Sequence, residues 1–236
     1  MLAGFALLWG ILHGSASALG SLRGEWGIVV ALLVVASAIL WESRTRRIRR
    51  AEAARSLGLV RPALRPLLGA CAVSAALLCL LPLYGWSTGT PMALVPNWYL
   101  YVPGLLAQAG IAEETVFRGF VFRHFRNGRP FWRAALLSAL PFTLVHLILF
   151  ATLDAAVAAA SLALALSMSF PLAWIFERSG NSIWPPAVVH FVAQGAIKLV
   201  EIPVSDFVPL VAIWMLAGGV LPWLLFFVRP RRAAAL

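Results

Sequence analysis

The chain of 236 residues is 61% hydrophobic and only 12% charged, with a mean hydropathy of +0.88. Soluble domains are closer to half apolar and a quarter charged, so this composition excludes a soluble protein and predicts a polytopic membrane protein. The net charge of +10 does not indicate nucleic acid, because the basic residues cluster in a few short loops between apolar segments.

Eight apolar segments are predicted to cross the membrane. A span needs about 20 mostly apolar residues to cross roughly 30 Å of hydrocarbon, and its backbone must satisfy its own hydrogen bonds, which predicts helices. The predicted spans are 2–20, 26–41, 67–85, 99–122, 134–152, 155–176, 183–200 and 208–228. The fold class is therefore an all-α membrane protein, a bundle of about eight transmembrane helices in one domain over residues 1–236.

The arginines predict the orientation of this bundle. They gather in the loop 42–66, in the loop 123–133 and in the tail after residue 228, and eight spans place all three on one side. Basic loops face the cytoplasm, so both termini are predicted to be cytoplasmic. The loop 42–66 is the longest and is expected to lie along the cytoplasmic surface. No positive charge precedes the first apolar run, which favours an uncleaved first span over a signal peptide.

Few ionisable residues lie inside the spans. A charge near the bilayer centre costs at least about 2.5–3.5 kcal/mol and usually serves a function or faces a partner. Glu113, His146 and His190 lie roughly 14, 18 and 11 Å from the cytoplasmic ends of three different spans, at the helical rise per residue. Their similar depth predicts one polar cluster in the cytoplasmic half of the bilayer. His13 is alone in the first span and is expected to be structural.

The spacing of these residues predicts how they face one another. Glu114 and Arg118 are four residues apart and share a helix face, which predicts an ion pair. Glu113 is turned by about 100° from Glu114, so it is expected to face a different wall of the same cavity. His190 and Gln194 are also four residues apart and are expected to project together.

A glutamate and two histidines from different helices support two hydrolytic chemistries. In one, Glu113 is a general base that takes a proton from water. The histidines then position that water or stabilise an oxyanion, and Gln194 donates a further hydrogen bond. In the other, Glu113, His146 and His190 bind a zinc ion that activates the water. The residues alone do not choose between these chemistries.

Three short motifs resemble those of a known family. EETVFR at 113–118, FTLVH at 142–146 and HFVAQ at 190–194 resemble the motifs of the CPBP intramembrane proteases, which include the type II CAAX prenyl endoproteases and bacterial Abi proteins. The lead-in GNSIWPPAVVH at 180–190 is also similar. Three motifs in order, each on its own predicted helix, form a specific signal over about residues 95–200. The first three spans and the last one rest on hydropathy alone.

The resemblance implies an intramembrane endopeptidase in an eight-helix bundle, with a cavity open towards the cytosol or the lipid. It implies that Glu113 activates water and that Gln194 occupies the position where the family has asparagine or aspartate. The longer side chain of Gln194 changes the expected oxyanion geometry more than the reaction. The implied catalytic residues are Glu113, His146, His190 and Gln194, and the implied supporting residues are Glu114, Arg118 and Phe142.

The expected partners are the lipid bilayer and a membrane-embedded peptide or protein tail, with no nucleic acid. The composition suggests a bacterial inner membrane, and the sequence indicates neither the substrate nor the oligomeric state. A catalytically silent scaffold or bacteriocin-immunity-type binding protein is the alternative, for which Gln194 leaves room. A proton-relay transporter is less favoured, because the chain shows no internal repeat.

Overall fold

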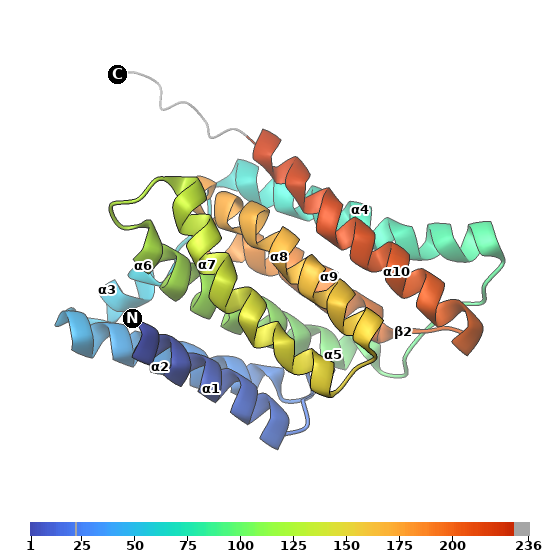
Figure 1. The fold of residues 1–236 in the computed structure, drawn as a ribbon, viewed down its shortest axis with the longest axis horizontal. Helices are drawn as coiled ribbons and strands as arrows, with labels where there is room; N and C mark the ends of the chain where they lie inside the picture. The colour runs from blue at the N-terminus through green and yellow to red at the C-terminus, as the bar shows by residue number, and fades with distance from the viewer. Residues whose placement is uncertain (22, 229–236) are drawn as a thin grey trace.

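The computed structural model describes residues 1–21 and 23–228, which form a bundle of long helices (Figure 1). The first half contains α1 (Leu2–Ala18), α2 (Gly27–Arg46), α3 (Arg50–Ser56), α4 (Leu64–Thr88), β1 (Ala93–Leu94), α5 (Trp98–Leu105), η1 (Leu106–Ala112), η2 (Thr115–Phe122) and α6 (Arg123–Arg126). The second half contains α7 (Phe131–Val145), η3 (His146–Ala151), α8 (Ala155–Arg178), α9 (Trp184–Gly195), η4 (Ala196–Leu199), β2 (Val200–Glu201), α10 (Val204–Val220) and η5 (Leu221–Phe227).

The chain is an all-α membrane protein apart from one very short strand pair. In the described residues, five helical segments are long and apolar enough to cross a membrane: 27–46, 64–88, 131–151, 155–178 and 204–227. α1 is equally apolar but shorter, and the remaining two predicted spans are also helical. All eight apolar segments therefore fold as helices. The count of eight spans, the single domain over 1–236 and the cytoplasmic placement of both termini stay predictions.

The segment 42–66, expected as the longest loop, contains helix at both ends and in the middle, and its cytoplasmic placement stays a prediction. α2 continues to Arg46 and α3 occupies seven residues of the segment. Basic residues near the C-terminus of α2 interact favourably with the helix dipole, and Arg47 ends that helix in a left-handed conformation (φ 54°). The tail arginines used for the orientation, Arg229, Arg231 and Arg232, lie outside the described residues.

A buried carboxylate near the C-terminal end of α2 joins this helix to α6. Glu42 is fully buried and accepts hydrogen bonds from the guanidinium groups of Arg123 and Arg46. The Nε2 atom of His124 lies 3.4 Å from the other oxygen of Glu42. Burial lowers the pKa of Arg123 from its ordinary value, and the Glu42 carboxylate opposes this shift. The pairing fixes the end of the helix that carries Glu113.

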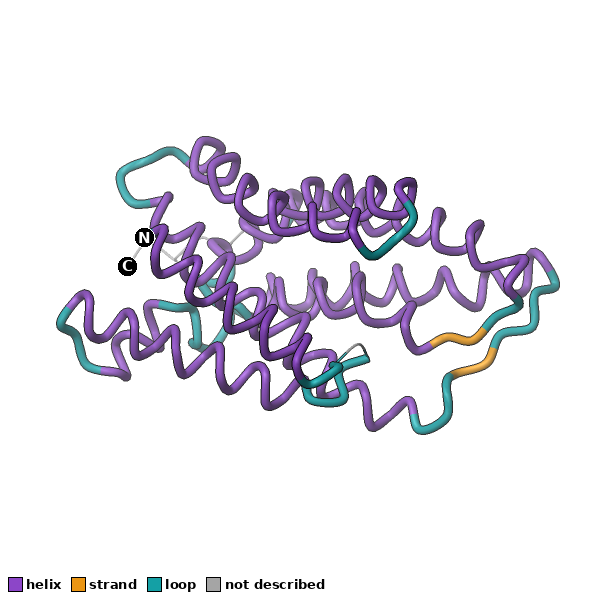
Figure 2. Tube along the Cα trace, turned by 60° about the horizontal axis from the view of Figure 1, so that its bottom comes forward, coloured by secondary structure: helices purple, strands orange, loops and turns teal. Residues whose placement is uncertain are grey.

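The two strands form the opposite end of the molecule, where they appear in orange (Figure 2). β1 and β2 are antiparallel, with Ala93 opposite Glu201 and Leu94 opposite Val200. The backbone N–H of Val95 also donates to the Leu199 carbonyl over 3.0 Å. These bonds tie the start of α5 to the end of η4. The two helical segments that contribute Glu113 and His190 are thus held together at one end.

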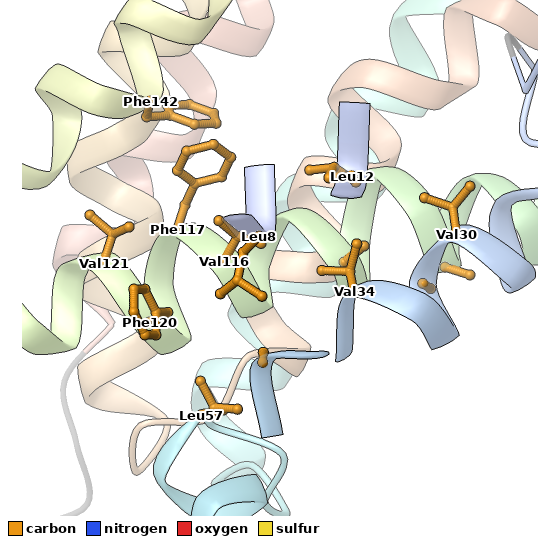
Figure 3. Packing of buried hydrophobic residues seen from close by; sticks show 14 of the residues in the cluster. Leu8, Leu12, Val30, Val34, Leu57, Val116, Phe117, Phe120, Val121 and Phe142 are labelled. Atoms are coloured by element: carbon orange, nitrogen blue, oxygen red, sulfur yellow. The ribbon is translucent and has the colours of Figure 1, made fainter. Parts of the chain in front are cut away.

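The first two helices pack against the helix that carries the glutamates. Leu8 of α1 and Val30 and Val34 of α2 are fully buried in one cluster with Val116 and Phe117 of η2 (Figure 3). This cluster lies next to the Glu113–Arg118 segment and excludes water from that side of it. The N-terminal helices therefore support the site through apolar packing.

The start of α2 touches α5 backbone to backbone. A Cβ atom on Gly104 would lie 1.8 Å from the Gly24 carbonyl oxygen, and one on Gly27 would lie 2.0 Å from the Gly104 carbonyl oxygen. Neither contact can be relieved by rotating a side chain, because both neighbours are backbone atoms. Glycine at these positions lets α2 and α5 approach closely.

Gly104→Ala is therefore expected to lower the free energy of unfolding by about 1–3 kcal/mol, the usual cost of overpacking. Thermal unfolding in detergent measures this change. Gly10→Ala in α1 is the matched control, because a Cβ there meets no atom within 4 Å. Alanine is also the better helix former, so the control is expected to be neutral or slightly stabilising. Equal melting temperatures for the two variants would contradict the close-approach explanation.

Candidate active site

The two glutamates lie between two stretches of π-helix. η1 ends at Ala112 and η2 begins at Thr115, so Glu113 and Glu114 are the residues that join them. The π-helix is rare and occurs mostly as short insertions near functional sites. A regular α-helix was expected over 99–122, and the structure differs here. Hydropathy predicts that this segment is a helix, but it does not distinguish a π-helix from an α-helix.

A buried ion pair lies behind the cavity. Arg118 donates from Nη1 to Oε1 of Glu114 over 2.7 Å, as the spacing predicted. Both side chains are almost completely buried, with 3% and 0% of their areas exposed. The same Glu114 oxygen lies 2.7 Å from Nδ1 of His190, which is buried on α9. One carboxylate thus connects the helix of the first motif to the helix of the third.

The ring of Phe142 lies at the centre of the three motifs. The Arg118 guanidinium carbon is 4.7 Å from the ring centroid, a cation–π contact. The rings of His146 and His190 meet Phe142 edge to face, with centroids 4.9 and 5.8 Å away. Phe142 is itself buried. It therefore orients a cation and both histidines through packing alone, which fits the supporting position that the resemblance implied.

Glu113 points away from the ion pair and into a cavity of about 200 Å³. Its side chain keeps 15% of its area exposed, and its Oε2 lies 3.5 Å from Nε2 of His190. His146 and Gln194 line the same cavity. The two glutamates therefore face different surroundings, as their spacing predicted.

His146 presents one ring nitrogen to this cavity. Its Nδ1 lies 2.6 Å from the backbone carbonyl oxygen of Phe142, one turn earlier in α7. Because a carbonyl can only accept, Nδ1 carries the hydrogen and donates it. The other nitrogen, Nε2, is then the atom able to contact a water or a substrate. Backbone geometry thus selects the orientation of this imidazole.

The structure brings the predicted site residues together in two layers. Glu113, His146 and Gln194 line the cavity. Glu114, Arg118, Phe142 and His190 are buried behind them. His190 was expected to face substrate water directly, whereas the structure places its ring between the two glutamates. It can therefore act on the cavity only through Glu113.

Zinc bound by Glu113 and the two histidines was the second hypothesis for this site. Among residues 1–21 and 23–228, no three His, Cys, Asp or Glu side chains are grouped so that they could hold a metal ion. Nδ1 of His190 is engaged by Glu114 and Nδ1 of His146 by a backbone carbonyl, which leaves Nε2 as the ring nitrogen of each that could bind a metal. Zinc bound by Glu113, His146 and His190 stays a prediction that metal analysis tests.

The cavity also includes residues that the sequence did not single out. Gln108 lines it and exchanges hydrogen bonds with Ser21, which donates from Oγ to Gln108 Oε1 over 2.7 Å. An amide in an apolar span, five residues before Glu113, was a signal available in the sequence. Trp9 and His13 of α1 are also in the wall. Their placement depends on tertiary packing that no local pattern predicts.

Comparison with known families agrees with the motifs. Residues 95–196 match the family model described as type II CAAX prenyl endopeptidase Rce1-like. The matched segment begins after α4, ends before α10 and contains all seven predicted site residues. The resemblance inferred from the three motifs is thereby confirmed. No curated protein and no solved structure matches the chain.

Proposed function

Because residues 95–196 match the Rce1-like type II CAAX prenyl endopeptidase family, we propose that the chain is an intramembrane endopeptidase. It hydrolyses a peptide bond in the tail of a membrane-associated peptide or protein, in the cytoplasmic half of the bilayer. The lipid bilayer is the second partner. A bacterial inner membrane stays the predicted location.

One observation carries this proposal. Within the described residues, Glu113 is the one carboxylate in the wall of the cavity, beside an imidazole and a primary amide. The charged pair of Glu114 and Arg118 is sealed behind it. A base, a polar ring and an amide donor around one small cavity are the groups that hydrolysis of an amide bond requires.

The proposed reaction uses these groups in order. Glu113 takes a proton from a water molecule as the water oxygen attacks the substrate carbonyl carbon. The amide of Gln194 donates a hydrogen bond to the oxyanion that forms, and Nε2 of His146 accepts a hydrogen bond that positions the attacking water. Glu113 then gives its proton to the departing amine nitrogen as the carbon–nitrogen bond breaks. Water supplies the oxygen of the new carboxylate, and no other reactant is needed.

The buried layer balances the charge of this base. Arg118 neutralises Glu114, and Glu113 is the second negative charge of the first motif. The ring of His190 lies between the two carboxylates, with Nε2 3.5 Å from Glu113 and Nδ1 2.7 Å from Glu114. Fixed charges in a water-poor site act more strongly than they do in water. This explains why two carboxylates, an arginine and an imidazole occur together in an apolar bundle.

Cleavage of defined peptides tests the proposal. The purified protein in lipid nanodiscs is incubated with a set of membrane-anchored tail peptides, and the products are identified by mass spectrometry. We expect one new peptide terminus in the wild-type reaction and none with Glu113→Gln. If the wild-type protein cuts no tail peptide and still binds one, the silent-scaffold alternative holds instead.

Gln194→Leu is expected to lower kcat by about 10²–10³-fold, the usual effect of removing one oxyanion donor. Gln194→Asn keeps the amide and installs the residue of the family pattern, so its loss is expected to be smaller. Steady-state cleavage by both variants measures the difference. If Gln194→Leu cuts as fast as the wild-type protein, Gln194 is not a donor to the oxyanion.

A further inference from the structure

One face of α1 lines the cavity although α1 lies outside the matched segment. The residues on this face are spaced i, i+3, i+4 and i+7, so they lie on one side of the helix. They are Trp9, Leu12, His13 and Ala16. Leu8, one turn before Leu12, is buried in the cluster that contains Phe117 (Figure 3). α1 therefore packs on η2 and also lines the cavity that Glu113 enters.

His13 is the polar group of this face. Its ring stacks on Trp9, with centroids 5.1 Å apart and planes inclined by only 4°. The side chain is exposed, and no hydrogen bond from its ring to another described residue is present. Histidines inside membrane spans usually have a partner or a function. The structural role expected from the sequence therefore has no hydrogen bond to support it.

An intramembrane peptidase needs such a group for a physical reason. A peptide bond in a helix is shielded by its neighbours, so the segment to be cut must leave the helical conformation. Its N–H and C=O groups then lose their partners, and each unsatisfied group costs several kcal/mol in hydrocarbon. The cavity wall must supply replacement donors and acceptors. Glu113, His146 and Gln194 are engaged in the reaction itself, which leaves other residues of the wall, those of α1 among them, to hold the substrate.

On the basis of the proposed function, we propose that the stacked Trp9 and His13 form a subsite that binds an extended, apolar peptide segment beside the cleaved bond. His13 hydrogen-bonds the substrate backbone with its ring nitrogens. Trp9, Leu12 and Ala16 contact an apolar substrate side chain. The first helix of the protein thus contributes to substrate binding, while the three motif helices carry out the reaction.

Steady-state kinetics separate this role from a structural one. His13→Ala is expected to raise KM about tenfold, the effect of losing about 1.4 kcal/mol of binding, and to leave kcat near its wild-type value. His13→Gln keeps a donor and an acceptor and is expected to restore most of the affinity. Trp9→Ala is expected to raise KM most for substrates with a large apolar side chain, and Trp9→Phe is expected to raise it less.

Leu7→Ala is the matched control on α1. Leu7 is 45% exposed and belongs to neither the cavity wall nor the buried clusters of the described chain. It is expected to leave both constants unchanged. If the wild-type protein cuts its substrate but His13→Ala and Trp9→Ala match Leu7→Ala, the subsite is overturned while the proposed function stands.

A cross-linking measurement does not depend on cleavage. The Glu113→Gln protein in nanodiscs is irradiated with a leucine-rich tail peptide that carries photoreactive leucine at successive positions. Mass spectrometry is expected to find adducts on residues 9–16. Fewer adducts are expected when the same protein also carries His13→Ala. Adducts confined to other helices, or no adducts, would overturn the subsite. Adducts on α1 without any wild-type cleavage would support the subsite and overturn the peptidase.

Discussion

Glu113→Gln is expected to reduce the rate of peptide cleavage by about 10²–10⁴-fold, the usual contribution of a positioned general base. The amide has the shape of the carboxylate but cannot take a proton from water. In the described chain, no second carboxylate lines the cavity to replace it. Single-turnover cleavage in nanodiscs measures the chemical step without product release.

The variant must also remain folded and able to bind. Glutamine keeps the shape of glutamate beside Nε2 of His190, which lies 3.5 Å from Oε2 of Glu113, so the melting temperature is expected to change little. Glu201→Gln is the matched control, because Glu201 is an exposed carboxylate on β2 at the strand end of the molecule. Cleavage by Glu113→Gln at the rate of this control would show that Glu113 is not the base.

Arg118→Met is expected to lower the free energy of unfolding by about 3–5 kcal/mol, because it leaves the Glu114 carboxylate buried without its cation. Both side chains are at most 3% exposed, so water cannot replace the lost partner. The double variant Glu114→Gln/Arg118→Met removes both charges and is expected to recover most of the stability. It is not expected to recover cleavage, because His190 then lacks the carboxylate that holds its Nδ1.

Arg49→Met is the comparison for this prediction. Arg49 and Glu52 are also close in sequence and paired, but their side chains are 83% and 40% exposed. Exposed pairs contribute about 0–1 kcal/mol, so this change is expected to be small. Thermal or denaturant unfolding of the four proteins measures the difference. Similar losses for Arg118→Met and Arg49→Met would contradict a structural role for the buried pair.

Much of the candidate site could be predicted from short-range spacing. The i, i+4 rule predicted the pair of Glu114 and Arg118. The rotation of about 100° between consecutive helix residues predicted that Glu113 faces a different direction from Glu114. Equal depth in three spans predicted that the motifs meet. These inferences succeed because helix geometry is regular and because lipid makes buried charges costly. The apolar segments likewise predicted every long helix.

Other features depend on interactions that local patterns do not contain. Hydropathy predicts the helix around Glu113, but it does not predict that two stretches of this helix are π-helical. The position of His190 behind Glu113, and not in the cavity wall, follows from its contact with Glu114. Trp9 and His13 reach the cavity only because α1 packs on η2. In each case tertiary packing decides the role of a residue that spacing alone leaves open.

Metal analysis combined with cleavage tests the central claim, that Glu113 activates water by itself. The purified protein is assayed for bound zinc, and cleavage by wild type and Glu113→Gln is measured with and without a chelator. If Glu113 acts without a metal, wild-type cleavage persists in the chelator and disappears in Glu113→Gln. Stoichiometric zinc, with cleavage that a chelator abolishes and added zinc restores, would contradict this claim and make Glu113 a metal ligand.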